Sequence, residues 1–361
     1  MAKRSSSRIA RDLGRRDGRH PALQKRAIGA AGLAAVGAAA AAGKSLLDRR
    51  RREERAGRAF GLRTDETVPD GVRRIARGQI DIALDALRGG RDREAGVHEA
   101  RKALKRLRTL LRLVRGDLDP ATYRHELHTF RDIGRRLAVA RDSQVAVETL
   151  DAVTDRFAAE LPDRAIEPLR SRLDTEHREA QRRLVADDAV LGTAIRDLEA
   201  ARVRVPAWSL AHHDFQALSP GLRRIYRRGR RAARTARDDP STENVHELRK
   251  RVKDLWYTTQ ILRRVAPPRT RSTAHHVSDL IGEDHDLALL RTQALRHRRE
   301  FIHRDVLTAL TAVIDRRRAQ LRAEALAETE RLYSKRPRRF VQRMERHWRK
   351  RMPDTAEPTA A

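Results

Sequence analysis

The chain contains no cysteine, and only 4% of its 361 residues are aromatic. The absence of cysteine excludes disulfide bonds, thiolate zinc sites and thiol nucleophiles. The scarcity of aromatic residues leaves Leu, Ala, Val and Ile to build the core, and it argues against a protein that stacks single-stranded bases. Alternating runs of Val, Ile, Thr and aromatic residues long enough for a sheet are also missing. The apolar residues instead recur with a period near 3.6, which predicts an all-α protein.

Acidic residues are too few to balance the basic ones. The chain has 80 Lys and Arg against 50 Asp and Glu, a formal net charge of +30. Residues 1–59 hold 16 basic and 5 acidic residues, or +11, which leaves +19 for the remainder. The part predicted to fold is therefore basic in its own right. Such a charge indicates a polyanionic partner, which could be nucleic acid, an acidic membrane surface or a phosphate polymer.

Long hydrophobic runs are absent as well. The uncharged segment Ala27–Gly43 is nearly all Ala and Gly, and it is shorter than the roughly 20 strongly apolar residues that span a membrane. Because 26 mostly polar and basic residues precede it, a signal peptide is not expected either. We predict that residues 1–59 form a basic, largely disordered extension and that residues 351–361 form a disordered tail. Membrane binding is not expected, and the protein is expected to be cytoplasmic.

One cationic pattern occurs twice, 148 residues apart. The first copy is Val-His-Glu-Ala-Arg-Lys-Ala-Leu-Lys-Arg-Leu at 97–107, and the second is Val-His-Glu-Leu-Arg-Lys-Arg-Val-Lys-Asp-Leu at 245–255. Lysine is rare in this chain, yet Lys102, Lys105, Lys250 and Lys253 hold matching positions in the two copies. Random basic composition would have placed arginine there, so the repeat indicates a site or two halves of one.

On a helix, the basic residues of the first copy fall within about 120° of arc. We call this arc the cationic stripe; it comprises His98, Arg101, Lys102, Lys105, Arg108 and Arg112. The apolar residues lie about 130° away around the helix and provide a face to bury. Glu99 is predicted to point elsewhere, so the stripe is expected to lack acidic partners and to need an external anion. The alternative is a solvated helix face.

The order of predicted helices also repeats. Helices are expected at about 71–87, from the cap Asp92 to near Gly116, from Asp119-Pro120 to Leu137, and over roughly 143–200. Residues 203–219 break the pattern. Ser219-Pro220 is then predicted to cap a helix through Ala236, the second striped helix follows Asp239-Pro240 until Pro267-Pro268, and a third helix leads to Asp286. We predict two pseudo-equivalent helical bundles, at about 70–202 and 219–350, joined by a linker at 203–218.

These segments resemble the CHAD family of α-helical proteins. The resemblance rests on the paired V-H-E-x-R-K-x-x-K segments, on Leu-Arg-Arg-Ile-Tyr-Arg-Arg-Gly-Arg-Arg at 222–231, and on Arg141-Asp142 and His285-Asp286, expected to close the third helices. It covers about residues 60–349 and implies two four-helix-bundle repeats around a basic groove that binds inorganic polyphosphate. It also implies residence at polyphosphate deposits and no enzymatic activity, metal or cofactor. The N-terminal triphosphate-processing domain that many relatives carry is not visible here.

By motif position, the resemblance implies a groove lined from both halves. The helices that carry the repeated pattern would contribute His98, Arg101, Lys102, Lys105, Arg108, Arg112, His246, Arg249, Lys250 and Lys253. The first helix of each half and the third helix of the first half would add Arg73, Arg74, Arg77, Arg135, Arg223, Arg224, Tyr226, Arg227 and Arg230. Asp254 stands where the first copy has Arg106, off the stripe, and is expected to matter little. Trp256 replaces Arg108 and removes one cation from the second half.

Two further interpretations remain open from the residues alone. A metal-dependent phosphohydrolase could use His98, His246, Glu283, Asp284, His285 and Asp286, although the surrounding cations would repel a metal. A non-specific nucleic-acid-binding protein fits the charge equally well, and the basic run 336–351 with Phe340 and Trp348 most resembles a nucleic-acid or membrane contact. The simpler interpretation of that run is an amphipathic helix that packs Phe340 and Val341 on the second bundle.

Overall fold

The computed structural model describes residues 60–89, 92–137, 141–186, 188–301 and 304–352. In this part the chain is helical almost throughout, and it forms only one isolated β-bridge, between Leu118 and Leu210. The predicted all-α class is therefore confirmed there. The extension 1–59, with its Ala/Gly segment, and the tail 353–361 lie outside the described residues.

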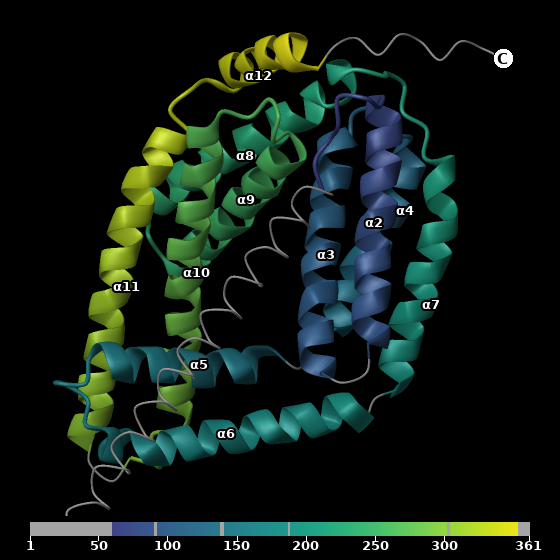
Figure 1. Ribbon diagram of the computed structural model, residues 1–361. Helices are drawn as coiled ribbons and strands as arrows, with labels where there is room; N and C mark the ends of the chain where they lie inside the picture. Colours follow the sequence, from purple (N-terminus) through teal and green to yellow (C-terminus); the bar gives the residue numbers. More distant parts are fainter. Residues whose placement is uncertain (1–59, 90–91, 138–140, 187, 302–303, 353–361) are drawn as a thin grey trace, which may run out of the picture. The chain divides into compact units, whose positions relative to one another are not determined.

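Figure 1 shows the helices in chain order. The first group comprises α2 (Val68–Arg88), α3 (Arg93–Val114), α4 (Pro120–Arg136), α5 (Arg141–Arg156), α6 (Asp163–Ala186) and α7 (Asp188–Arg204). Two single-turn 3₁₀ helices follow, η1 (Val205–Ala207) and η2 (Phe215–Ala217), where the sequence predicted a break. The chain then forms α8 (Ser219–Asp238), α9 (Thr242–Ile261), α10 (Pro268–Arg296), α11 (Arg304–Leu332) and α12 (Pro337–Arg351).

Side-chain caps start the helices of the first half where the sequence indicated. The Asp92 carboxylate accepts a hydrogen bond from the backbone N–H of Ala95 at 3.0 Å, and Asp119 accepts one from Thr122 at 2.8 Å. Each bond satisfies a backbone donor that has no partner within the helix. Pro120 follows Asp119 as the first residue of α4, where its missing N–H costs nothing. Both predicted N-caps are confirmed.

Two predicted boundaries in the second half are wrong. Ser219 is the first residue of α8, and the N-cap is Leu218, which makes no side-chain capping bond. The helix predicted to lead to Asp286 continues to Arg296, because Leu287, Leu290 and Ala294 extend its buried face without a helix-breaking residue. His285-Asp286 therefore lies inside α10. Arg141-Asp142 begins α5 rather than closing the preceding helix.

The helices pack in two groups. In one, α2 contacts α3 and α7, and α4 contacts α3 and α7; in the other, α10 contacts α9 and α11, and α8 contacts α9 and α11 (Figure 1). A core of buried apolar residues runs through both groups. The helix α5 packs against α6 and also against α10, so this segment of the first half contacts the second half directly.

A close approach joins α3 to α8. A Cβ atom on Gly221 would overlap the backbone carbonyl of Leu113, so only glycine allows the two helices to lie this near each other. The α3 helix also contacts α9. This three-helix junction brings together residues that lie more than a hundred positions apart in the sequence.

Among the described residues, the helices are too short or too polar to cross a bilayer.

Candidate functional site

Acidic residues accompany the cationic stripe of α3, contrary to the prediction. Lys102 Nζ lies 3.7 Å from a carboxylate oxygen of Glu99, one helical turn earlier. At the other end of the stripe, Arg112 Nη1 lies 2.8 Å from Oδ1 of Asp254, which belongs to α9. Arg101 donates a hydrogen bond to the carbonyl of Leu137 at 3.1 Å. The expectation of a stripe without acidic partners is therefore wrong, since it considered only one face of one helix.

The matching residues on α9 face a mixed environment. Lys250 is exposed and lies 3.6 Å from Glu247. Arg249 and Lys253 line a cleft of about 460 Å³ together with residues of α5, α10 and α11. The same cleft is lined by further residues of both signs, namely Arg156, Arg317, Glu148, Asp279, Glu283 and Asp286. The positive charge of this half of the repeat is thus largely offset by nearby carboxylates.

The two histidines of the second half lie against each other. The ring centroids of His246 on α9 and His285 on α10 are 5.1 Å apart. Burial lowers the pKa of His246, and the neighbouring Lys250 and Arg249 lower that pKa further. Its Nδ1 atom is buried without a hydrogen-bond partner among the described residues. We expect this ring to be neutral near neutral pH.

Two of the residues of the hydrolase interpretation, Glu283 and Asp284, accept hydrogen bonds from arginines. Glu283 accepts two bonds from Arg317, at 2.7 and 3.0 Å. Asp284 is buried and accepts bonds from Arg318 at 3.1 Å and from Arg322 at 2.8 Å. In the described part of the chain, no three His, Asp or Glu side chains are arranged to hold a metal ion. These contacts give Glu283 and Asp284 structural roles.

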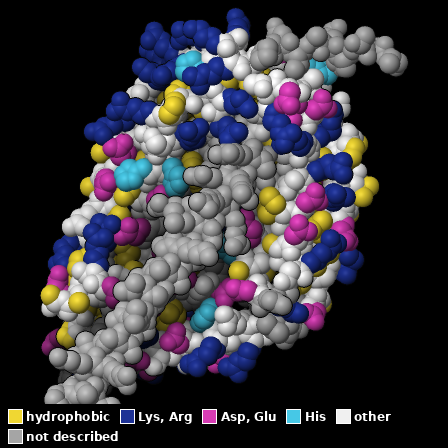
Figure 2. All heavy atoms as spheres, in the orientation of Figure 1, with side chains coloured by type: hydrophobic (Ala, Val, Ile, Leu, Met, Phe, Trp, Pro, Cys, Tyr) yellow, Lys and Arg dark blue, Asp and Glu magenta, His cyan; other side chains and the backbone are white. Residues whose placement is uncertain are grey.

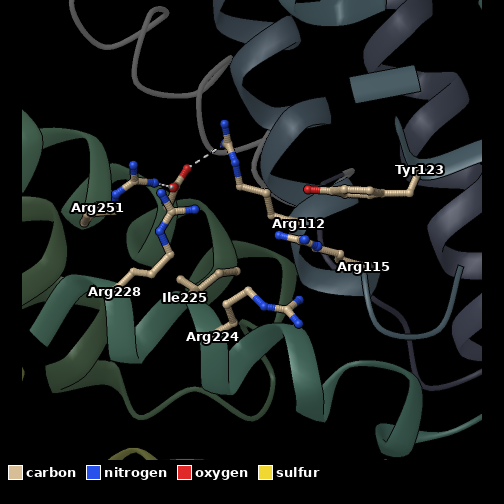
Figure 3. Close-up of a pocket in the computed structure, with 8 residues that line it drawn as sticks. Arg112, Arg115, Tyr123, Arg224, Ile225, Arg228 and Arg251 are labelled. Atoms are coloured by element: carbon tan, nitrogen blue, oxygen red, sulfur yellow. Dashed lines mark hydrogen bonds and ion pairs between the residues drawn. The ribbon is translucent and has the colours of Figure 1, made fainter. Parts of the chain in front are cut away.

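A concentration of positive charge lies at the junction of α3, α8 and α9. Five arginines line one small cavity there, together with Tyr123, Ile225 and Asp254: Arg112 and Arg115 from α3 and its end, Arg224 and Arg228 from α8, and Arg251 from α9. Figure 3 shows the guanidinium groups of Arg112, Arg228 and Arg251 near one carboxylate, and those of Arg115 and Arg224 near each other. We call these five residues the arginine cluster. The cavity has a volume of about 20 Å³, enough for a single water molecule.

Among the described residues, Asp254 is the carboxylate that lines this cavity, and Glu247 lies beside the cavity, 2.6 Å from Arg251. Asp254 is buried, and it accepts bonds from Arg112 at 2.8 Å, from Thr109 at 3.3 Å and from Arg251 at 3.2 Å. The prediction that Asp254 matters little is therefore wrong. Its counterpart in the repeat, Arg106, is also buried, and its guanidinium lies over the Phe60 ring. This repeat position faces the protein interior in both halves.

The pKa values of three arginines in and beside the cluster are lowered, first by burial and then by neighbouring cations. Burial lowers the pKa of Arg108, and the adjacent Arg112 lowers that pKa further. Burial likewise lowers the pKa of Arg224, with a contribution from Arg115, and the pKa of Arg228, with a contribution from Arg251. Nη1 of Arg224 is buried without a hydrogen-bond acceptor among the described residues. A phosphate oxygen, which is about the size of the water that the cavity can hold, would relieve both the repulsion and the missing bond.

A second depression continues from the cluster. It has a volume of about 260 Å³ and shares Arg228 and Arg251 with the cavity; Arg231, Thr235, Asn244 and Glu247 also line it. On α8, Arg224, Arg228 and Arg231 follow one another at the spacing of one helix face. The cationic lining therefore runs along α8 for about 10 Å.

The residues predicted on α8 do not share one face. Arg224 joins the arginine cluster, whereas Arg223, Arg227 and Arg230 lie about 90° around the helix. Tyr226 is fully buried, stacks on Phe340 at 4.0 Å, and donates a hydrogen bond to the carbonyl of Leu332 at 3.1 Å. A groove-lining role for Tyr226 is therefore wrong, because its place in an arginine-rich segment concealed a core contact.

The arginines predicted on α2 and α4 lie away from the cluster cavity. Arg73 donates to the Trp208 carbonyl at 2.9 Å and pairs with Asp70 at 2.8 Å. Arg74 pairs with Glu66 at 2.6 Å and donates to the Gly61 carbonyl at 2.9 Å. Arg77 is exposed, as is Arg135, which lies 3.9 Å from Asp132. Arg73 therefore links α2 to the segment after α7, Arg74 links α2 to the segment before it, and Arg77 and Arg135 face solvent.

Sequence reasoning missed Arg115, Arg228 and Arg251. The spacing of Arg224, Arg228 and Arg231 would have identified the second cationic face of α8. A further signal is the pair Ile-Gly at 133–134 and 281–282, again 148 residues apart. A Cβ atom on Gly134 would lie 3.8 Å from the guanidinium of Arg108, and one on Gly282 would lie 4.0 Å from that of Arg249. Both glycines leave room beside a cation of the repeated helices.

The fold and this cluster define an all-helical protein with a strongly cationic junction between helices of its two halves. The CHAD domain matches residues 74–295, which is more than half of the chain, and the protein belongs to the CHAD domain family. The suspected family is thereby confirmed.

Among solved structures, the chain is similar to "PptA from Streptomyces chartreusis". The TM-score is 0.54 at 15% sequence identity, and the match covers 75% of this chain and 100% of the other. At this identity the likeness concerns the fold alone. No curated protein sequence matches the chain.

Proposed function

We propose that this protein binds inorganic polyphosphate without catalysis, through the arginine cluster and the adjoining cationic residues of α3, α8 and α9. The observation that carries the proposal is the charge imbalance of the cluster: among the described residues, five guanidinium groups and one carboxylate line the cavity, and Glu247 beside it pairs with Arg251 at 2.6 Å. Membership of the CHAD family supports the choice of polyphosphate among polyanions. In this proposal the two helix groups are pseudo-equivalent repeats that enclose a basic groove, and the protein resides in the cytoplasm at polyphosphate deposits.

The chemistry of the ligand suits this lining. Polyphosphate is a flexible chain of like charges with no bases to read, so its receptor needs many cations and little shape selectivity. Arginine offers bidentate contacts to phosphate oxygens, and lysine offers a compact mobile charge. A phosphate oxygen would also accept the bond that Arg224 Nη1 lacks among the described residues. The Asp254 carboxylate shows how the cluster arranges itself around an anion.

The test is a salt titration of the full chain with long-chain polyphosphate and with duplex DNA. The cluster variant Arg224→Gln/Arg228→Gln is compared with Arg298→Gln/Arg299→Gln, which removes the same charge from exposed positions beyond α10. The cluster variant should lose polyphosphate affinity. The slope of log binding constant against log salt concentration should become shallower by about 1.4, or about 0.7 for each of the two lost contacts, as in single-stranded polyanions. The control variant should bind like the parent.

A second variant, Lys102→Glu/Lys105→Glu/Lys250→Glu/Lys253→Glu, tests the contribution of the two stripes. We expect it to weaken polyphosphate binding while circular dichroism shows native helix content. Unchanged polyphosphate affinity in both variants would reject the proposed site. Equal affinity for polyphosphate and DNA at every salt concentration, again unchanged in both variants, would instead favour a general nucleic-acid-binding protein.

A further inference from the structure

The C-terminal helix α12 is anchored by one face. Phe340 stacks on Tyr226 of α8, and the Trp348 ring lies 5.6 Å from that of Phe215. Val341 and Met344 are buried on the same side. The prediction that this helix packs Phe340 and Val341 on the second helix group is confirmed. This packing leaves the opposite side of α12 facing solvent.

That solvent-facing side is almost entirely cationic. Its exposed residues include Arg338, Arg339, Arg343, Arg346, Arg349 and Lys350, whereas Glu345 is the only acid in the helix and pairs with Arg349 at 2.6 Å. Within the described residues, Arg338, Arg339, Arg343 and Arg346 have no hydrogen-bond or ion-pair partner. Figure 2 shows Lys and Arg side chains gathered at the end of the molecule where Figure 1 draws α12.

The neighbouring helix α8 carries a matching row. Arg223, Arg227, Arg230 and Arg234 follow one another at intervals of four, three and four residues, so they share one side of the helix. Arg230 lies close enough to Tyr226, on which α12 packs, to influence the pKa of that phenol. The row lies about 90° from the side that joins the arginine cluster. We call this row and the exposed residues of α12 the α8–α12 surface.

The composition of the α8–α12 surface indicates which class of polyanion it can bind. The exposed large hydrophobic residues of the described chain are Val203 and Leu295, and neither lies on α8 or α12. The surface therefore offers no apolar anchor for a membrane and no aromatic ring on which single-stranded bases could stack. What it offers is a broad set of cations that recognise phosphate groups alone.

The cations of α12 lie on two flanks of the helix, an arrangement that suits contact with two rows of phosphates. Arg339, Arg343, Arg346 and Lys350 share one flank, and Arg338 and Arg349 lie about 100° around the helix on another. The major groove of DNA is about 12 Å wide, admits an α-helix, and has a phosphate strand on each side. We infer that the α8–α12 surface binds the phosphate backbone of duplex DNA without sequence preference, as a second polyanion site separate from the arginine cluster.

The experiment measures binding of the full chain to duplex DNA of about 20 base pairs, roughly three times the length that α12 spans. The variant Arg339→Gln/Arg343→Gln/Arg346→Gln is compared with Arg296→Gln/Arg298→Gln/Arg299→Gln, an equal charge change at exposed positions at the end of α10. We expect the α12 variant to reduce the salt slope by about 2.7, or about 0.9 per lost contact, and the control to bind like the parent. Replacement of the same three arginines by lysine should retain binding, because non-specific contacts need charge rather than bidentate geometry.

Polyphosphate binding in the same samples separates this inference from the proposed function. We expect the α12 variant to lose more affinity for DNA than for polyphosphate, and Arg224→Gln/Arg228→Gln to show the opposite order. An equal loss of DNA affinity in the α10 control would overturn the inference. Undiminished DNA binding in the α12 variant would also overturn the inference. So would an α12 variant that loses affinity for anionic vesicles but keeps its affinity for DNA. The DNA result stands whether or not the cluster binds polyphosphate.

Discussion

Arg112 on α3 and Asp254 on α9 form an ion pair of 2.8 Å that links the two halves of the chain. The same carboxylate accepts bonds from Thr109 and Arg251, so it ties α3 to α9 at the centre of the arginine cluster. Asp254 therefore stabilises the unliganded protein by supplying the cluster with its one lining counter-charge. An added polyanion would supplement that charge from outside.

Replacement of Asp254 tests this balance. We expect Asp254→Asn to lower the free energy of unfolding by about 1–3 kcal/mol, because buried donors lose a charged acceptor. The variant should also gain more thermal stability from added polyphosphate than the parent, since the cavity loses its lining carboxylate and keeps only the Glu247 carboxylate beside it, 2.6 Å from Arg251. Thermal unfolding with and without polyphosphate measures both effects. An unchanged melting temperature together with an unchanged polyphosphate shift would contradict the role assigned to Asp254.

The close approach of α3 and α8 predicts different outcomes for two glycines in helices. Gly221→Ala should destabilise the protein by about 1–3 kcal/mol, because its Cβ would overlap the Leu113 carbonyl and push α8 away from α3. Gly78→Ala should instead stabilise it by about 0.5–1 kcal/mol, since a Cβ there meets no atom within 4 Å. Denaturant unfolding of both variants provides the comparison. Similar values for the two would contradict the close approach.

The buried position of Tyr226 predicts a structural effect without a binding effect. Tyr226→Phe removes a hydroxyl that donates to Leu332 and accepts from the Lys335 N–H at 3.3 Å. We expect the free energy of unfolding to fall by about 1 kcal/mol. Polyphosphate affinity at a temperature where the variant is folded should match that of the parent. A specific loss of affinity at full helix content would restore Tyr226 to the binding site.

The environment of His246 predicts a pH dependence of stability. Its pKa in the folded protein is lowered from the ordinary value of 6.5, so protonation favours the unfolded chain. The free energy of unfolding should therefore be independent of this group above pH 6.5 and should decrease as the pH falls below that value. His285 on α10 and Glu247, Arg249 and Lys250 on its own helix surround the ring. The variant His246→Gln should show a weaker decrease between pH 7 and pH 5 in denaturant titrations; an identical decrease would assign it to other groups.

The helices that carry the site could be predicted from the sequence with good accuracy. The N-caps at Asp92 and Asp119 and the break after Arg204 lie where local signals placed them, because such signals depend on neighbours within a few residues. Both copies of the repeated pattern lie on helices, α3 and α9, as the sequence predicted. The helix α10 was predicted to end at Asp286 and continues to Arg296. Its end depends on the continued burial of its apolar face, which local signals do not show.

The sequence by itself determined the all-α class, the excess of positive charge and the two copies of the cationic helix, because periodicity, composition and capping are local properties. Only the tertiary structure decided which of the many cations act together. Arg112, Arg224 and Arg251 belong to three helices and meet because Gly221 allows α8 to approach α3 and because the buried Asp254 draws α9 toward them. The cationic stripe indicated Arg112 and the family resemblance indicated Arg224, but neither indicated Arg228, Arg251 or the importance of Asp254. Charges at such a junction interact through space, and their distances follow from packing rather than from spacing along the chain.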